Sequence, residues 1–87
     1  MIVAFLPDGW EDYIFWQDTD RKALQKINKL IKECQRTPFD GSGQPEALRK
    51  NLAGWWSRRI DQKHRLIYRI HGEILEIAQC RFHYGDH

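Results

Sequence analysis

Long hydrophobic runs, cysteine pairs and metal-binding motifs are all missing from this sequence of 87 residues. No segment approaches the ~18 consecutive apolar residues that a membrane-spanning helix needs. The apolar stretch at residues 1–6 is short, lacks a cationic lead and meets Pro7, so it does not fit a secretory signal peptide. Cys34 and Cys80 stand in apolar patterns without zinc-type spacing. We therefore expect a cytoplasmic protein with reduced thiols, no metal, no cofactor and no membrane contact.

Charge of one sign is absent from one part of the chain and scarce in another. The first 20 residues contain five acidic side chains and no lysine or arginine, although the net charge of the whole chain is +2. Residues 49–69 contain seven basic side chains and one acid, Asp61. Small domains can be patchy by chance, but such a tract favours a cationic face that receives phosphate groups or an acidic partner.

The N-terminal half has the patterns of one strand and two helices. A composition of 41% hydrophobic residues argues against disorder, and the length predicts a single domain over residues 1–87. Residues 2–6 suit a strand buried on both faces. Residues 10–17 suit a helix capped by Asp8 or Gly9. Residues 21–35 form the clearest helix, with one apolar stripe made of Leu24, Ile27, Leu30, Ile31 and Cys34.

The second half predicts a sheet. Residues 37–45 hold glycines and prolines typical of a loop, and residues 45–48 suit one helical turn. Three strands follow, at residues 55–60, 63–70 and 74–84. The fold class is therefore α/β of the α+β kind, a compact domain in which an N-terminal strand and two helices pack on an antiparallel-rich sheet.

Burial decides the expected strand register, because a slip of one residue exchanges the two faces of a strand. Placing Ile70 opposite Ile74 gathers an apolar face, with Glu76 as its one misfit; its members are Leu66, Tyr68, Ile70, Ile74, Ala78, Cys80 and Phe82. Placing Ile60 opposite His64 adds Trp56 and Ile60 to that face, together with Arg58. The apolar face would pack on the helices, and the opposite face would gather Trp55, Arg59, Arg65, Arg81 and His83.

Such a cationic face has the groups that RNA cleavage by internal 2′-OH attack requires, without a metal. His83 is the best candidate acid, and Glu46 is the best candidate base, because it is the one carboxylate in the loop that enters the basic tract. Arg59 and Arg65 would hold the phosphate, assisted by Arg81. Trp55 or Tyr84 would stack on a base.

Each residue also has a plainer interpretation. A lone histidine near a chain end is usually an exposed surface residue, and an acid after proline often only favours a helix N-terminus. The arginines are equally compatible with a solvated sheet face. His64 is interpreted as apolar-facing and structural, and His71 as part of a turn.

Six blocks of the sequence resemble the YoeB (Txe) toxins of the wider RelE-like superfamily. They cover nearly the whole chain, at residues 12–17, 26–32, 36–41, 51–60, 64–68 and 80–84. The resemblance implies a compact RelE-like α/β domain and a type II toxin that cuts mRNA in the ribosomal A site without metal. It also implies inhibition by a YefM-type antitoxin, whose acidic segment we expect over the cationic face, and a possible homodimer.

The resemblance also implies roles for individual residues. The family's general base, phosphate-stabilising arginine and general acid fall on Glu46, Arg65 and His83. Arg59 matches a phosphate-contacting position of the family, Tyr84 matches a family residue near the reacting nucleotide, and Arg49 stands where lysine is familiar. Relatives usually carry an acid where this chain has Lys63, and residues 85–87 extend past the tyrosine. A non-catalytic binding toxin of the same fold, such as a topoisomerase poison, is the alternative; a free RNase is a third.

Overall fold

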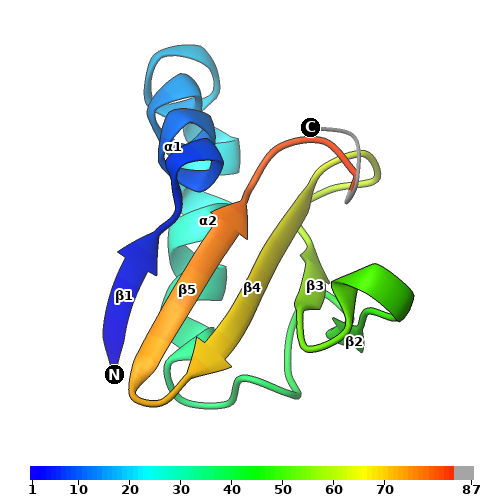
Figure 1. Ribbon diagram of the computed structural model, residues 1–87. Helices are drawn as coiled ribbons and strands as arrows, with labels where there is room; N and C mark the ends of the chain where they lie inside the picture. The colour runs from blue at the N-terminus through cyan, green and yellow to red at the C-terminus, as the bar shows by residue number, and fades with distance from the viewer. Residues whose placement is uncertain (84–87) are drawn as a thin grey trace.

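The computed structural model describes residues 1–83 and has two helices on a five-stranded sheet (Figure 1). The elements are β1 (Ile2–Phe5), α1 (Pro7–Thr19), α2 (Arg21–Cys34), β2 (Glu46–Ala47), η1 (Lys50–Leu52), β3 (Trp56–Arg59), β4 (Arg65–His71) and β5 (Ile74–Gln79). The sheet order is β1-β5-β4-β3-β2; β1 runs parallel to β5, and every other pair is antiparallel. The expected α+β arrangement is therefore confirmed. Among the described residues, neither helix has the length and apolar character of a membrane span.

The helices begin and end at residues with clear physical reasons. Pro7 opens α1 at a position where a missing N–H costs nothing, so the helix starts earlier than expected and Leu6, not Asp8 or Gly9, is its N-cap. Asp20 separates the helices as predicted and caps α2, accepting from the N–H groups of Lys22 and Ala23 at 3.0 and 3.1 Å.

Both helices cover one face of the sheet, and the predicted α2 stripe is the centre of the core. One cluster joins it to Trp16 of α1 and to inward side chains of the strands and of the residues that directly follow them: Ile60, Leu66, Tyr68, Leu75, Ile77 and Cys80. Both cysteines are free and buried, as expected. The strand β1 is not buried on both faces, because it lies at the sheet edge, where Ile2 is 64% exposed.

The register between β4 and β5 differs from the prediction by one residue. Ile70 lies opposite Leu75, not Ile74, and the pairing shifts after Tyr68–Ile77 so that Ile67 lies opposite Gln79. Ala78 is thus an extra residue, a β-bulge that exchanges the faces of the residues after it. Leu75, Ile77 and Cys80 thereby all enter the core. Glu76 is no misfit, because it turns away from the helices and pairs with Arg69.

Two further elements differ from expectation. Residues 46–47 form the short strand β2 beside β3 instead of a helical turn. The last strand ends at Gln79, and residues 80–83 form an irregular bend instead of continuing the strand to residue 84. His71 is the last residue of β4, paired with Ile74, so the turn itself is shorter than expected.

Arg58 fixes the loop between α2 and β2 to the sheet. Its side chain is fully buried and donates from Nε to the Tyr68 hydroxyl and from Nη1 to Glu33, both at 3.1 Å. It also donates to three loop carbonyls, those of Thr37, Asp40 and Ser42. Burial alone would lower the pKa of Arg58, but its hydrogen bonds and nearby charges raise it above its ordinary value. The one arginine that the prediction assigned to the apolar face is therefore fully paired there.

Gly43 completes the junction between this loop and the sheet. It has a positive φ of 82°, and its carbonyl accepts from the Arg59 N–H at 2.7 Å. A Cβ at this position would meet the Arg59 carbonyl at 3.0 Å and strain the backbone. Glycine here lets the loop approach β3 closely enough to bond it.

Candidate active site on the open sheet face

The sheet face that the helices leave uncovered, called the open face below, carries most of the predicted site. Alternation along the strands puts Glu46 of β2, Ser57 and Arg59 of β3, and Arg65 and Ile67 of β4 on this face. Glu46 lies opposite Ser57, and Ser57 lies opposite Ile67. Arg59 lies directly opposite Arg65, one step nearer the β3–β4 turn. The register therefore brings the candidate base and both candidate phosphate ligands to one surface, as predicted.

Arg65 is the most constrained residue of the open face. It is only 8% exposed, and its Nη1 donates to the carbonyls of Asp61, Gln62 and His64 at 2.8, 3.2 and 3.1 Å. These three carbonyls belong to the turn between β3 and β4, which folds back beneath the guanidinium. A planar guanidinium held along one edge presents its remaining donors in a fixed direction, which suits recognition of a phosphate.

Glu46 and Arg59 are exposed, but their backbones are fixed. The backbone of Arg59 is held by Gly43, and its side chain lies in the hollow formed with Gln44 and Gln62. The strand that carries Glu46 pairs with β3 at its only two residues. Both side chains can therefore reach a bound ligand without first leaving a buried position.

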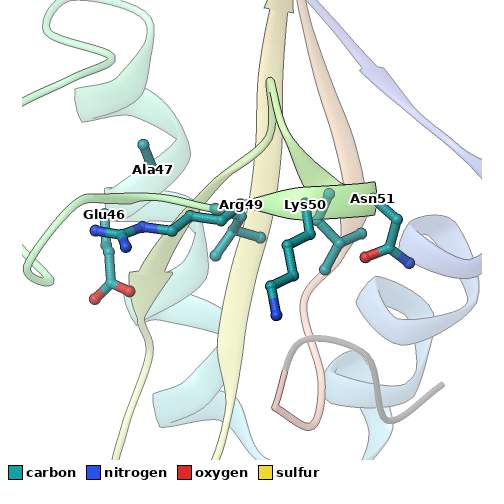
Figure 2. A pocket seen from close by; sticks show the side chains of 7 residues that line it. Glu46, Ala47, Arg49, Lys50 and Asn51 are labelled. Atoms are coloured by element: carbon teal, nitrogen blue, oxygen red, sulfur yellow. The ribbon is translucent and has the colours of Figure 1, made fainter.

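Glu46 lines a shallow hollow of about 270 Å³ with residues of the following loop and η1, including Arg49 and Lys50. Figure 2 shows Glu46 and Lys50 directed to the same side of this loop, with Arg49 extending toward Glu46. Lys50 adopts a positive φ of 57°. It was not among the predicted site residues, although its place beside Arg49 in the basic tract was a usable signal.

His83 approaches the open face through the irregular residues after β5. The Arg65 N–H donates to the Phe82 carbonyl at 2.9 Å, and the Gln79 Nε2 donates to the His83 carbonyl at 3.2 Å. In Figure 1 this segment crosses from the end of β5 toward the turn between β3 and β4. His83 thus directly follows the residue bonded to the Arg65 backbone. The predicted Tyr84 lies outside the described residues.

Trp55 and Arg81 were both predicted on the cationic face, and the structure places them differently. Trp55 lies on the open side, where the Arg69 guanidinium sits 4.4 Å from its ring centroid. Arg81 was predicted on the cationic face, and this is wrong: its guanidinium lies 3.5 Å from the ring centroid of Phe15 in α1 and 4.4 Å from that of Phe82. Arg81 follows the bulge and the end of β5, so strand alternation no longer determines its direction.

His64 is structural, as predicted. Its ring meets Trp16 edge to face at 4.8 Å, and its Nδ1 accepts from the Phe82 N–H at 2.7 Å. Burial lowers the pKa of His64, which favours the neutral imidazole that this acceptor role requires.

The open face therefore combines a carboxylate, two guanidinium groups and a nearby histidine, drawn from four parts of the chain. Adjacent strands lie about 4.8 Å apart, so the backbones of β2 and β4 are separated by about 10 Å, a span that side chains reaching inward can close around one phosphodiester. A carboxylate at one end, an imidazole toward the other and guanidinium groups between them are the kinds of group that an in-line displacement at phosphorus uses. Within residues 1–83, no group of three or more His, Cys, Asp or Glu side chains is arranged to hold a metal ion.

Comparisons with known proteins agree on one family. A family model described as the YoeB-like toxin of bacterial type II toxin–antitoxin systems matches residues 5–84. Toxin YoeB of Escherichia coli (strain K12) is 53% identical over 84 residues, which is 97% of this chain and 100% of that protein. The structure of a YoeB/ParE toxin from Agrobacterium tumefaciens superimposes with a TM-score of 0.94, at 50% identity over 97% of this chain and 100% of that chain.

YoeB of Staphylococcus aureus is similar as well, and it has been solved in two assemblies. In a YoeB–YefM complex it is 40% identical with a TM-score of 0.89, and as a YoeB dimer it is 41% identical with a TM-score of 0.90. Both alignments cover 97% of this chain and 98% of that chain.

Proposed function

This chain belongs to the YoeB family of toxins of bacterial type II toxin–antitoxin systems, and we propose that it is a ribosome-dependent endoribonuclease that cuts mRNA in the A site and thereby stops translation. The observation that carries the proposal is the strand register, which gathers Glu46, Arg59 and Arg65 on the open face beside the segment that bears His83.

The reaction is attack of a ribose 2′-oxygen on the adjacent phosphorus. The Glu46 carboxylate takes the 2′-OH proton as the P–O bond forms. Arg65 and Arg59 donate to the phosphoryl oxygens, where negative charge increases. The protonated His83 imidazole gives its proton to the 5′-oxygen as the P–O bond to that oxygen breaks. The products are a 2′,3′-cyclic phosphate and a 5′-hydroxyl end, and no metal takes part.

The shape of the open face supports a role for the ribosome. Glu46 and Arg59 are exposed, and the hollow beside Glu46 is shallow, so this surface cannot itself fix the ribose and phosphate of a flexible RNA. Orientation of the reacting groups accounts for much of the rate of such reactions. A ribosome that holds the mRNA in its A site would supply that orientation. Arg49 and Lys50, which line the hollow beside Glu46, and Trp55 on the open side would contact the RNA.

A YefM-type antitoxin is the proposed inhibitory partner. The S. aureus relative forms a complex with YefM, and the open face of this chain offers cations to an acidic segment that folds on binding. A homodimer is proposed by the same reasoning from the S. aureus YoeB dimer.

The test is cleavage of a defined mRNA with and without programmed ribosomes, comparing wild type with His83→Ala and with His71→Ala as control. His71 lies at the far end of β4 and is exposed, so it matches the substitution without touching the site. We expect cutting only with ribosomes, abolished by His83→Ala and retained by His71→Ala. Ribosome binding by a folded wild type without any cutting would reject the nuclease and favour a non-catalytic binding toxin.

A further inference from the structure

Residues 80–83, called the C-terminal segment below, are not part of a strand, yet other parts of the chain bond their backbone closely. The Cys80 N–H donates to Asp12 Oδ2 at 3.0 Å, and the Cys80 carbonyl accepts from the Trp16 Nε1–H at 2.8 Å. Both partners are buried residues of α1. An aspartate placed in the interior in this way replaces the strand partner that Cys80 lacks.

The second half of the segment is held from the sheet side. The His64 Nδ1 accepts from the Phe82 N–H at 2.7 Å, and the Arg65 N–H donates to the Phe82 carbonyl at 2.9 Å. The Gln79 side chain, 8% exposed, donates from Nε2 to the carbonyls of Arg81 and His83 at 3.0 and 3.2 Å. The side chains of His64 and Gln79, together with the backbone N–H of Arg65, therefore hold this part of the segment.

The backbone at Phe82 adopts a conformation that needs such support. Its φ is +65°, in the left-handed region that bulky L-residues rarely adopt. Strain of this kind persists only where the surroundings over-determine the conformation, and it is frequent at functional sites. The hydrogen bonds to the backbone N–H and carbonyl of Phe82 hold it in this conformation, and the next residue is His83.

We propose that His64 and Gln79 are positioning residues: by bonding the backbone on either side of Phe82, they fix where the His83 imidazole stands relative to a phosphate held by Arg65. This inference rests on the proposed nuclease function, because it assigns His83 the acid role. His64 acts as an acceptor through Nδ1, so its proton lies on Nε2 and the ring is neutral. Gln79 acts as a double donor through Nε2.

A purely structural role for His64 would be packing against Trp16, and a pair of substitutions separates the two roles. His64→Asn keeps an acceptor near the position of Nδ1 but loses most of the ring. His64→Phe keeps a ring against Trp16 but has no acceptor. A packing role predicts that the Asn variant is the worse of the two in every assay. A positioning role predicts that the Asn variant is less stable yet the faster enzyme.

The experiment is single-turnover cleavage on programmed ribosomes, with saturating and limiting toxin, alongside the thermal midpoint of each variant. Misplacement of a catalytic group by about 1 Å costs about 100-fold in rate, so we expect a loss of about that size in His64→Phe at unchanged ribosome affinity. His64→Asn should cut at least about tenfold faster than His64→Phe. Equal cleavage by the two variants, or a loss that appears only in affinity, would overturn the positioning role.

Gln79→Met provides the same test if His64→Phe does not fold. Methionine fills a similar volume on the open face without donating, so cutting should fall while the thermal midpoint changes little. Hydrogen exchange of the Phe82 amide gives a readout independent of cleavage: it should be slow in wild type and His64→Asn and fast in His64→Phe. If the wild type cuts and the variants cut at the same rate, only the positioning role is wrong. If the wild type is inactive, the nuclease proposal and the positioning role are both wrong.

Discussion

On the helix-covered face of the sheet Arg58 is fully enclosed, and it donates to a tyrosine, a glutamate and three loop carbonyls. On the open face, Arg65 is bonded along one edge to the turn beneath it, and Arg59 beside it is exposed. Arg58 and Arg59 are consecutive in the sequence. Their opposite directions follow from the two-residue period of a strand.

The comparison shows that the basic tract is not one surface. The covered arginine organises the fold, since its donors are used to tie residues 37–42 to the sheet and to Tyr68. Burial raises the pKa of Tyr68 to about 12, so its hydroxyl remains a donor to the Pro38 carbonyl. The open-face arginines are placed for a ligand. Substitutions on the two faces should therefore affect different properties of the protein.

The largest expected effect is on stability, from Arg58→Met. The change leaves the carbonyls of Thr37, Asp40 and Ser42 without their donor, and removal of one partner from a buried network of this kind costs about 3–5 kcal/mol. Arg59→Gln is the matched control at the adjacent position, and it should change the free energy of unfolding by less than about 0.5 kcal/mol. Urea denaturation followed by tryptophan fluorescence measures both. Similar losses for the two variants would remove the distinction between the faces.

Arg65→Lys should have the next largest effect, this time on cleavage. Lysine keeps the charge but not the planar fork, so it cannot both hold the turn carbonyls and donate to two phosphoryl oxygens. Loss of a preorganised donor to a developing charge typically costs about 10²–10³ in rate. Single-turnover cutting on programmed ribosomes measures this, with circular dichroism to establish folding. A folded Arg65→Lys protein that cuts at the wild-type rate would exclude a specific guanidinium role.

The sequence predicts correctly, for most strand residues, which side chains share a face of the sheet. Alternation correctly put Arg59 and Arg65 together and paired Ile60 with His64, whose carbonyl accepts from the Ile60 N–H at 3.0 Å. It failed in the first part of β5, because Ile70 lies opposite Leu75 instead of Ile74. The extra residue at Ala78 then returns Gln79 and Cys80 to their predicted faces. Glu76, which the predicted register left as a misfit on the apolar face, was the available sign that the pairing at the turn differs by one residue.

The ends of elements were harder to predict, because long-range bonds determine them. The last strand stops where Asp12, 68 positions earlier in the chain, takes the Cys80 N–H. The residues around Glu46 form a strand because β3 offers an edge, which outweighs the helical preference of a proline followed by an acid. Neither contact has a signal in the local sequence.

Acidification should weaken the packing around His64 on the helix-covered face. Burial lowers the pKa of His64 from its usual 6.5, while Asp61 and Asp12 raise it and Lys63 and Arg81 lower it to smaller extents. A lowered pKa means that the unfolded chain takes the proton more readily, so the stability contributed by His64 is present above pH 6.5 and declines as the pH falls below it. Thermal midpoints between pH 7 and pH 5.5 should fall less steeply in His64→Asn than in wild type or His71→Ala. Identical slopes would contradict the lowered pKa.

The smallest effect is expected at Arg69, whose Nε bonds Glu76 on the open side at a partly exposed position. Ion pairs at such positions contribute about 0–1 kcal/mol. Arg69→Gln should therefore reduce the free energy of unfolding by no more than about 1 kcal/mol, and the difference should diminish in high salt. Urea denaturation at low and high ionic strength tests this. A salt-independent loss of unfolding free energy as large as that of Arg58→Met would show that arginines on the two faces contribute equally to stability.

The most direct measurement of the open face as a nuclease site is single-turnover cleavage of an A-site mRNA whose reacting nucleotide carries a 2′-deoxyribose. The wild-type toxin should cut the all-ribose mRNA to a 2′,3′-cyclic phosphate and leave the 2′-deoxy mRNA intact at that position, although it binds both ribosome complexes equally. Equal cutting of the two mRNAs would contradict internal 2′-OH attack, and with it the base and acid roles of Glu46 and His83.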